Sequence, residues 1–315
     1  MIKFLVITDG KLSGINQCSA VVNELKKIMK KKIIIKYFQA DFRFLKILPN
    51  FLIYYLLRIE NFFFRNYKQK SDFIISCGRI AAPLNLIFKR NNHDCKNCHI
   101  LNPYFKLDDF DKIIIPEHDL NGKSERDNFI ATFGTLVDKT KIFKKNSNLL
   151  KYIPSKKKII SVLIGGDGRS SKIKNNELAD VIKELNSLSK KFSIVYCFSR
   201  RTSINLIAFI KKNANDDCLF FPNKAYNPYW DILSVSCHLF VTGDSISMVS
   251  DCLTSGKPTY IIPIQNVKKK IKKFINLTIK KGLARIFKNN LENWRYIKLS
   301  EVDRVCINLK KILDF

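Results

Sequence analysis

The sequence has 315 residues, long enough for two hydrophobic cores, and its 46% apolar and 26% charged residues are ordinary for a globular protein. The net charge of +29 comes mainly from lysines spread along the chain without interleaved stacking aromatics, which argues against a nucleic-acid partner and for an AT-rich genome. No apolar run is long enough to span a bilayer, and the first is too short for a signal peptide, so we expect a cytoplasmic protein whose scattered lysines favour anionic membrane surfaces.

The first half of the chain alternates strand patterns with helix patterns. Strands are expected at residues 2–7, 32–37, 73–76, 99–101, 113–115 and 128–132, and helices at 14–30, 42–64 and 81–89. This alternation is typical of a parallel sheet covered by helices on both faces. The aromatic stretch 42–64, flanked by Lys46, Arg58 and Arg65, is expected to pack mostly into this domain. Its alternative role is to lean on the inner membrane and admit a lipid-linked acceptor.

A polar segment, 139–158, resembles a linker, and a second series of elements begins after it. Strands are expected at 158–164, 192–198, 218–220, 239–242 and 259–262, and helices at 175–190, 206–212, 229–236, 247–254, 268–281 and 300–313. We therefore predict an α/β protein with an N-terminal Rossmann-like domain (1–145), a C-terminal one (152–300) and a closing helix (301–315). Two such domains with parallel sheets facing across a cleft form the GT-B arrangement, with ligands at the carboxyl ends of the strands.

The cysteines give no metal or cofactor prediction. Their odd number, nine, argues for reduced thiols in a chain without a secretion signal. The run from Cys95 to His99 matches the c-type haem pattern, but haem attachment would require export, and zinc would need a second ligand pair. We interpret the match as accidental and Cys95 and Cys98 as loop and strand-entry residues.

Polar residues follow several of the expected strands in the first domain. The loop after the first strand suits a phosphate or sugar hydroxyls, although a glycine-bearing turn serves tight packing equally well; its candidates are Asp9, Gly10, Asn16 and Gln17. After the third strand, Arg79 suits a phosphate or carboxylate, or a structural salt bridge. For both loops the sequence leaves ligand binding and a purely structural role open.

The best acid/base candidate of the sequence is Pro116-Glu-His-Asp119, at the end of a strand. His118 between the carboxylates of Glu117 and Asp119 is suited to deprotonate an acceptor hydroxyl. The alternative is a histidine that only bonds a neighbouring loop.

In the second domain, too, polar, cationic or small residues follow four of the expected strands. Backbone N–H groups at Gly165 and Gly166 suit a diphosphate, and the helix after the strand 239–242 offers its N-terminus to an anion, unless Asp244 or Ser245 only caps it. The further ligand-binding candidates are Ser199, Arg200, Arg201, Thr202, Asn227, Tyr229, Asp244, Ser245, Ser247, Met248 and Asp251. Asn227 and Tyr229 are assigned to a base or sugar, or to a helix-entry turn, and Asp251 to ribose hydroxyls.

These segments resemble, in order and spacing, the mitochondrial-fission (elongated mitochondria) family of plants and its bacterial relatives. The matching motifs are Thr8-Asp-Gly10 with Asn16-Gln17, Ile75-Ser-Cys-Gly-Arg79, Pro116-Glu-His-Asp119, Leu163-Ile-Gly-Gly166, Ser199-Arg-Arg-Thr202, Asn227-Pro-Tyr229, Val241-Thr-Gly-Asp-Ser-Ile-Ser-Met-Val-Ser250, Gly256-Lys-Pro258, Phe274, Gly282-Leu-Ala-Arg285 and Trp294. The chain departs from the family at Asn102-Pro-Tyr104, where relatives tend to have acidic, proline and basic residues, and at Asp251, where a Glu is usual.

The resemblance implies a GT-B-like fold in a bacterial protein, but no catalytic residues. The bacterial branch is related to nucleotide-sugar proteins, whereas the plant branch recruits a dynamin-related GTPase to mitochondria. Two functions follow as hypotheses. One is a metal-independent glycosyltransferase, or nucleotide-diphosphate-sugar-binding protein, of cell-envelope glycan synthesis. The other is a non-catalytic adapter on the same scaffold.

Overall fold

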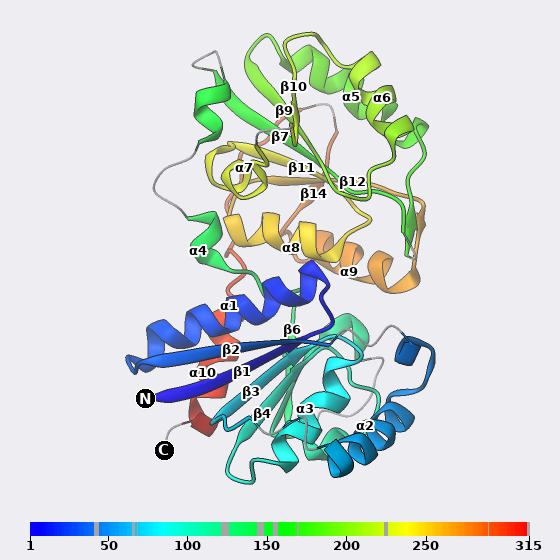
Figure 1. The fold of residues 1–315 in the computed structure, drawn as a ribbon. Coiled ribbons are helices and arrows are strands. Elements are labelled where there is room, and N and C mark those ends of the chain that lie inside the picture. The colour runs from blue at the N-terminus through cyan, green and yellow to red at the C-terminus, as the bar shows by residue number, and fades with distance from the viewer. Residues whose placement is uncertain are drawn as a thin grey trace. The chain divides into compact units, whose positions relative to one another are not determined.

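The computed structural model describes residues 1–40, 44–64, 67, 69–120, 126–143, 148–153, 157–168, 170–223, 226–288 and 290–313. The chain forms two compact units: the first unit is Met1–Asp138 with Ser300–Phe315, and the second unit is Lys139–Leu299. Figure 1 shows the elements of each unit. No helix within the described ranges is long and apolar enough to cross a bilayer.

The first unit contains a six-stranded, wholly parallel sheet in the order β2-β1-β3-β4-β5-β6. Its strands are β1 (Ile2–Thr8), β2 (Ile33–Gln39), β3 (Phe73–Cys77), β4 (Lys96–Ile100), β5 (Lys112–Pro116) and β6 (Phe129–Thr132), and its helices are α1 (Leu12–Met29), α2 (Asn50–Phe64), α3 (Ala81–Arg90) and α10 (Glu301–Leu313). Short 3₁₀ turns occupy Phe44–Ile47, Leu107–Asp109 and Glu117–Asp119. Pro49 separates the first of these turns from α2, so the expected helix 42–64 is two elements; residues 41–43 lie outside the described ranges.

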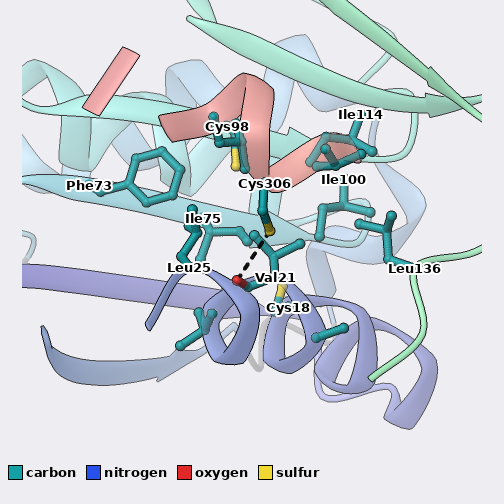
Figure 2. Close-up of a cluster of buried hydrophobic side chains, with 14 of the residues drawn as sticks. Cys18, Val21, Leu25, Phe73, Ile75, Cys98, Ile100, Ile114, Leu136 and Cys306 are labelled. Carbon is teal, nitrogen blue, oxygen red and sulfur yellow. Dashed lines mark hydrogen bonds between the residues drawn. The ribbon is translucent and has the colours of Figure 1, made fainter. Parts of the chain in front are cut away.

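Both faces of this sheet are apolar, as expected for parallel strands buried between helices. Phe4 and Val6 of β1 belong to a core with α1 and α10, whereas Leu5 and Ile7 belong to a second core with α2 and α3. The closing helix α10 is part of the first core, where Cys306 donates to the carbonyl oxygen of Val21 at 3.5 Å (Figure 2). The C-terminal end of the chain therefore completes the first unit.

The second unit repeats the plan with the strand order β10-β9-β7-β11-β12-β14, again wholly parallel. Its strands are β7 (Lys158–Ile164), β9 (Phe192–Phe198), β10 (Leu219–Phe221), β11 (His238–Thr242), β12 (Thr259–Ile262) and β14 (Arg285–Ile286), with an antiparallel pair of β8 (Ser171–Lys172) and β13 (Asn266–Val267). Its helices are α4 (Lys139–Ile142), α5 (Asn176–Leu188), α6 (Ile204–Asn213), α7 (Tyr229–Val235), α8 (Ile246–Ser255) and α9 (Lys269–Lys280).

Three details differ from the sequence expectations. Segment 139–158 is not a plain linker, because it carries α4 and a 3₁₀ turn, Leu149–Tyr152; residues 144–147 and 154–156 lie outside the described ranges. Strand β4 begins at Lys96, so Cys98 lies inside the strand and is not a strand-entry residue. The short strands β8, β13 and β14 were not expected, since two residues show no periodicity.

Candidate functional site

Each sheet has one point where the strand order reverses, and such points are where open α/β sheets bind ligands. In the second unit the chain moves from β7 outward to β9 and β10 and then returns to the other side of β7 at β11. Three loops therefore meet at the carboxyl ends of β9, β7 and β11: residues 199–202, 165–168 and 243–245. All three were singled out from the sequence.

The buried carboxylate of Asp244 holds these three loops together. It accepts hydrogen bonds from the Thr242 hydroxyl (2.6 Å), the Gly166 N–H (3.1 Å) and Arg201 Nη2 (3.1 Å). The second terminal nitrogen of Arg201 donates to the Gly166 carbonyl oxygen at 2.9 Å and to Ser171 Oγ at 3.3 Å. Asp244 is thus a structural anchor, and its partner Arg201, 42% exposed, is fixed beside the end of β11.

The glycine turn after β7 has its N–H groups committed inside the protein. Gly165 donates to the Thr242 hydroxyl, Gly166 to Asp244, Asp167 to the Arg201 carbonyl oxygen and Gly168 to the Ser171 carbonyl oxygen. A Cβ at position 165 would lie 2.0 Å from Asp244 Oδ1, and one at 166 would lie 2.1 Å from the Arg201 carbonyl oxygen. Close packing therefore explains both glycines, and the expected diphosphate cradle has no N–H left to offer from this turn.

The loop after β9 is closed by its own side chains. The Thr202 hydroxyl donates to the Gly165 carbonyl oxygen at 2.5 Å and accepts the Ser199 N–H at 2.9 Å, while Ser199 Oγ accepts the Arg201 N–H at 3.1 Å. These bonds assign structural roles to Ser199 and Thr202. Arg200 is exposed and makes no hydrogen bond or ion pair with any described residue, so its guanidinium is available.

The N-terminus of helix α8 follows directly after the carboxyl end of β11. Ser245 is the N-cap and accepts the Met248 N–H at 3.4 Å, and its hydroxyl lies 3.3 Å from that of Ser247. Among the described residues nothing accepts the N–H groups of Ile246 and Ser247, which are the usual unpaired donors of a helix start. Those donors and the helix dipole have the geometry that suits an anion. Met248 is buried and contributes packing.

Two other expected ligand residues, Tyr229 and Asp251, lie together. The Tyr229 hydroxyl donates to Asp251 Oδ2 at 2.5 Å, and Asn227 accepts the Tyr229 N–H at 3.2 Å in the turn that begins α7. Burial raises the pKa of the Asp251 carboxyl to about 7, although the Tyr229 hydrogen bond and the charge of Lys141 act to lower it. Burial and the charge of Asp251 raise the pKa of Tyr229 well above its usual value. Asp251 Oδ1 accepts no hydrogen bond within the described part of the chain, so one oxygen remains for a ligand hydroxyl.

In the first unit the strand order reverses between β1 and β3, and the expected residues there have partners inside the protein. Asp9 pairs with Lys11 at 2.5 Å and packs against Gly78, where a Cβ would lie 2.6 Å from Asp9 Cγ. Arg79 donates to the Leu48 carbonyl oxygen and to Asn50 Oδ1 (3.2 Å), so it anchors the start of α2.

The remaining two polar candidates of this loop are side chains of α1. Gln17 is buried, donates to Cys77 Sγ at 4.0 Å and accepts the Leu136 N–H at 3.3 Å. Asn16 is partly buried on the same helix, and Gly10 has a left-handed φ of 77°. These contacts support the packing alternative for this loop.

The acid/base candidates lie in the 3₁₀ turn after β5, two strands away from β3. His118 is buried, with Nε2 3.9 Å from Asp119 Oδ2, whereas Glu117 is exposed. Two strand spacings correspond to about 10 Å. The geometry therefore does not bring His118 to the point where the strand order reverses, and its catalytic role stays a prediction.

Sequence reasoning missed two supporting residues, Thr242 and Ser171, whose hydroxyls hold the Gly165 N–H and Arg201. The Thr-Gly-Asp spacing at the end of a strand is the signal that could have identified Thr242. For Ser171 no sequence signal exists. Within the described ranges no three His, Cys, Asp or Glu side chains are grouped to hold a metal ion.

Comparison with solved structures confirms the expected GT-B-like fold class. The UDP-GlcNAc 2-epimerase of Methanocaldococcus jannaschii is 13% identical with a TM-score of 0.57, over 98% of this chain and 100% of that one. The Neisseria meningitidis enzyme, bound to UDP-GlcNAc, is 16% identical with a TM-score of 0.56, over 100% and 92%. Os79 from O. sativa, in complex with UDP, is 11% identical with a TM-score of 0.53, over 98% and 91%. Identities this low show the fold alone.

Sequence relatives identify the family. The uncharacterized protein RP120 of Rickettsia prowazekii is 29% identical over 97% of both chains. The mitochondrial fission protein ELM1 of Arabidopsis thaliana is 24% identical over 76% of this chain and 63% of its own length. The model of the family described as mitochondrial fission ELM1 matches residues 14–313. The protein therefore belongs to the mitochondrial fission ELM1 family.

Proposed function

We propose that the second unit binds a nucleotide-diphosphate sugar, with the diphosphate at the N-terminus of α8. The observation that carries the proposal is the set of donors there: two unpaired N–H groups and the Ser245 and Ser247 hydroxyls, near a guanidinium of Arg201 that is 42% exposed and paired with Asp244. An arginine and a helix N-terminus both stabilise a phosphate. Arg200, exposed on the adjacent loop, supplies a second positive charge.

The Tyr229–Asp251 pair supports a nucleotide as the ligand. Asp251 lies on α8, between one and two turns beyond the first unpaired N–H groups, which suits a ribose next to a bound diphosphate. Its Oδ1 is the acceptor for a ribose hydroxyl, and Tyr229 holds Oδ2. Two structural neighbours point the same way, since the Neisseria meningitidis enzyme is bound to UDP-GlcNAc and Os79 is in complex with UDP.

The reaction that follows from this site is glycosyl transfer without a metal ion. Cations and the helix N-terminus would stabilise the negative charge of the leaving diphosphate. The acceptor is a lipid-linked or membrane-surface molecule of cell-envelope glycan synthesis, with His118 as its base. The second candidate function is a non-catalytic adapter; the family name and the burial of His118 favour it.

Binding and turnover distinguish these functions. Thermal shift and calorimetry measure the binding of UDP-, GDP- and ADP-sugars. For any sugar nucleotide that binds, a second assay measures transfer of its labelled sugar to a bacterial lipid extract. Arg200→Gln removes a guanidinium that makes no hydrogen bond or ion pair with a described residue, so we expect about tenfold weaker binding with unchanged stability. Arg295→Gln, also exposed and in the same unit, is the matched control.

Three results distinguish the glycosyltransferase from the adapter and test the site. His118→Gln should abolish transfer and spare donor binding. Donor binding without turnover in the wild type would support the adapter, and the absence of any nucleotide binding would refute the site itself.

A further inference from the structure

Helix α2 is apolar on both of its faces, and only one of them is covered. Ile53, Tyr54 and Leu57 are buried in the core that α2 shares with α3. Among the α2 side chains that the structure describes, Asn50 to Phe63, seven are large, apolar and between 37% and 78% exposed: Phe51, Leu52, Tyr55, Leu56, Ile59, Phe62 and Phe63. A helix that is hydrophobic all round is normally buried on all sides, so this outer face lacks a partner.

The exposed side chains form one continuous stripe. At 100° per residue the seven positions fall within about 140° of the helix circumference, and the helix is about 22 Å long. Ile47, 87% exposed in the preceding 3₁₀ turn, extends the stripe at its N-terminal end. Figure 1 shows α2 beside α3 on the outside of the first unit. We call these eight side chains the α2 stripe.

The sequence around the α2 stripe is strongly basic. Residues 43–70 contain one acidic residue, Glu60, and six basic ones: Arg43, Lys46, Arg58, Arg65, Lys68 and Lys70. Arg58 is exposed at the border of the stripe, while Glu60 accepts a hydrogen bond from the Tyr67 hydroxyl at 3.1 Å. Arg43, Arg65, Lys68 and the side chain of Lys46 lie outside the described part of the structure.

We propose that the α2 stripe docks on an anionic lipid bilayer, with α2 lying in the plane of the interface. The α2 stripe contains three Phe and one Tyr, aromatic side chains that favour the headgroup boundary. Arg58, exposed at the border of the stripe, supplies attraction to anionic headgroups, and the basic sequence on either side of the helix has the matching sign of charge, at about 1 kcal/mol for each basic residue close to the surface. A second copy of the chain is a poorer occupant, because it would bring two basic segments together. The α2 stripe belongs to the first unit, and the proposed nucleotide site belongs to the second.

The test uses the full-length protein and flotation with vesicles. The stripe variant is Ile59→Ser/Phe62→Ser/Phe63→Ser, and its matched control replaces three exposed isoleucines outside α2, Ile204→Ser/Ile297→Ser/Ile307→Ser. On phosphatidylglycerol-containing vesicles we expect at least about a tenfold loss of partitioning for the stripe variant and less than about twofold for the control. Equal losses in both variants, or none in either, would overturn the proposal.

Two further readouts keep the result interpretable if the triple variant is unstable. In the Phe62→Trp variant the fluorescence emission of the introduced tryptophan should shift to the blue on anionic vesicles. In the Ile204→Trp variant it should not shift. Pure phosphatidylcholine vesicles should bind the wild type at least about tenfold more weakly, because they lack the anionic charge. Equal binding to both lipids would refute the charge component. A lipid-free dimer that the stripe variant abolishes would assign the stripe to a second copy of the chain and overturn the lipid proposal.

Discussion

Replacing Asp244 with asparagine tests whether this carboxylate anchors the three loops of the second unit. Asp244→Asn keeps the size of the side chain but removes its charge and one of its two acceptor oxygens. The carboxylate accepts three hydrogen bonds, so at least one donor among Thr242, Gly166 and Arg201 loses its acceptor. A hydrogen bond to a charged group contributes about 1.5–3 kcal/mol, and water partly replaces the bond to the exposed Arg201. We expect a loss of about 2–4 kcal/mol.

Tryptophan fluorescence reports this loss from the second unit alone. The chain has two tryptophans, Trp230 and Trp294, and both belong to the second unit. For a unit of this size each kcal/mol lowers Tm by about 2–4 °C, so Asp244→Asn should lower the fluorescence Tm by about 4–16 °C. Asp216→Asn, at an exposed position of the same unit, is the control. A shift under about 2 °C, or one equal to that of Asp216→Asn, would show that Asp244 does not anchor the loops.

Two more predictions use the same melting assay. Gly165→Ala places a Cβ 2.0 Å from Asp244 Oδ1 and should strongly destabilise the second unit. Gly168→Ala places a Cβ no closer than 3.2 Å, to Arg201 Nη1, and should lower Tm much less; equal Tm values would contradict the packing role of Gly165. The carboxyl of Asp251, with its pKa raised to about 7 by burial, binds its proton more tightly in the folded protein than in the unfolded chain, so stability should fall as the pH rises from about 4 to about 7. Asp251→Asn should flatten this part of the pH profile, and an unchanged slope would argue against the raised pKa.

The sequence predicted the sheets well because the central strands, such as β1, β7 and β11, are nearly continuous apolar runs buried on both faces. Strand β7 was expected at exactly the residues it occupies, and β9 likewise. It also located the loops at the carboxyl ends of these strands. The strands of two residues could not be predicted, since they carry no pattern.

The roles of individual loop residues depended on partners far away in the chain. Whether Gly166 offers its N–H to a ligand depends on Asp244, 78 positions later. Arg79 would be available for a phosphate only without partners inside the protein, but it donates hydrogen bonds to Asn50 and Leu48. Conversely, Tyr229 and Asp251 were each singled out from the sequence, but only the fold shows that they form a pair. Local patterns locate polar residues at a sheet edge, and tertiary contacts decide which of them remain free.

The most direct test of the nucleotide site is a calorimetric titration of the wild-type protein with UDP, GDP and ADP, each beside its own monophosphate and nucleoside. If the diphosphate occupies the N-terminus of α8, at least one diphosphate should bind about tenfold or more tightly than its monophosphate, and the nucleoside should bind weakest. Arg200→Gln should remove most of this preference. Equal affinity for diphosphate and nucleoside, or no binding of any of them, would contradict the site.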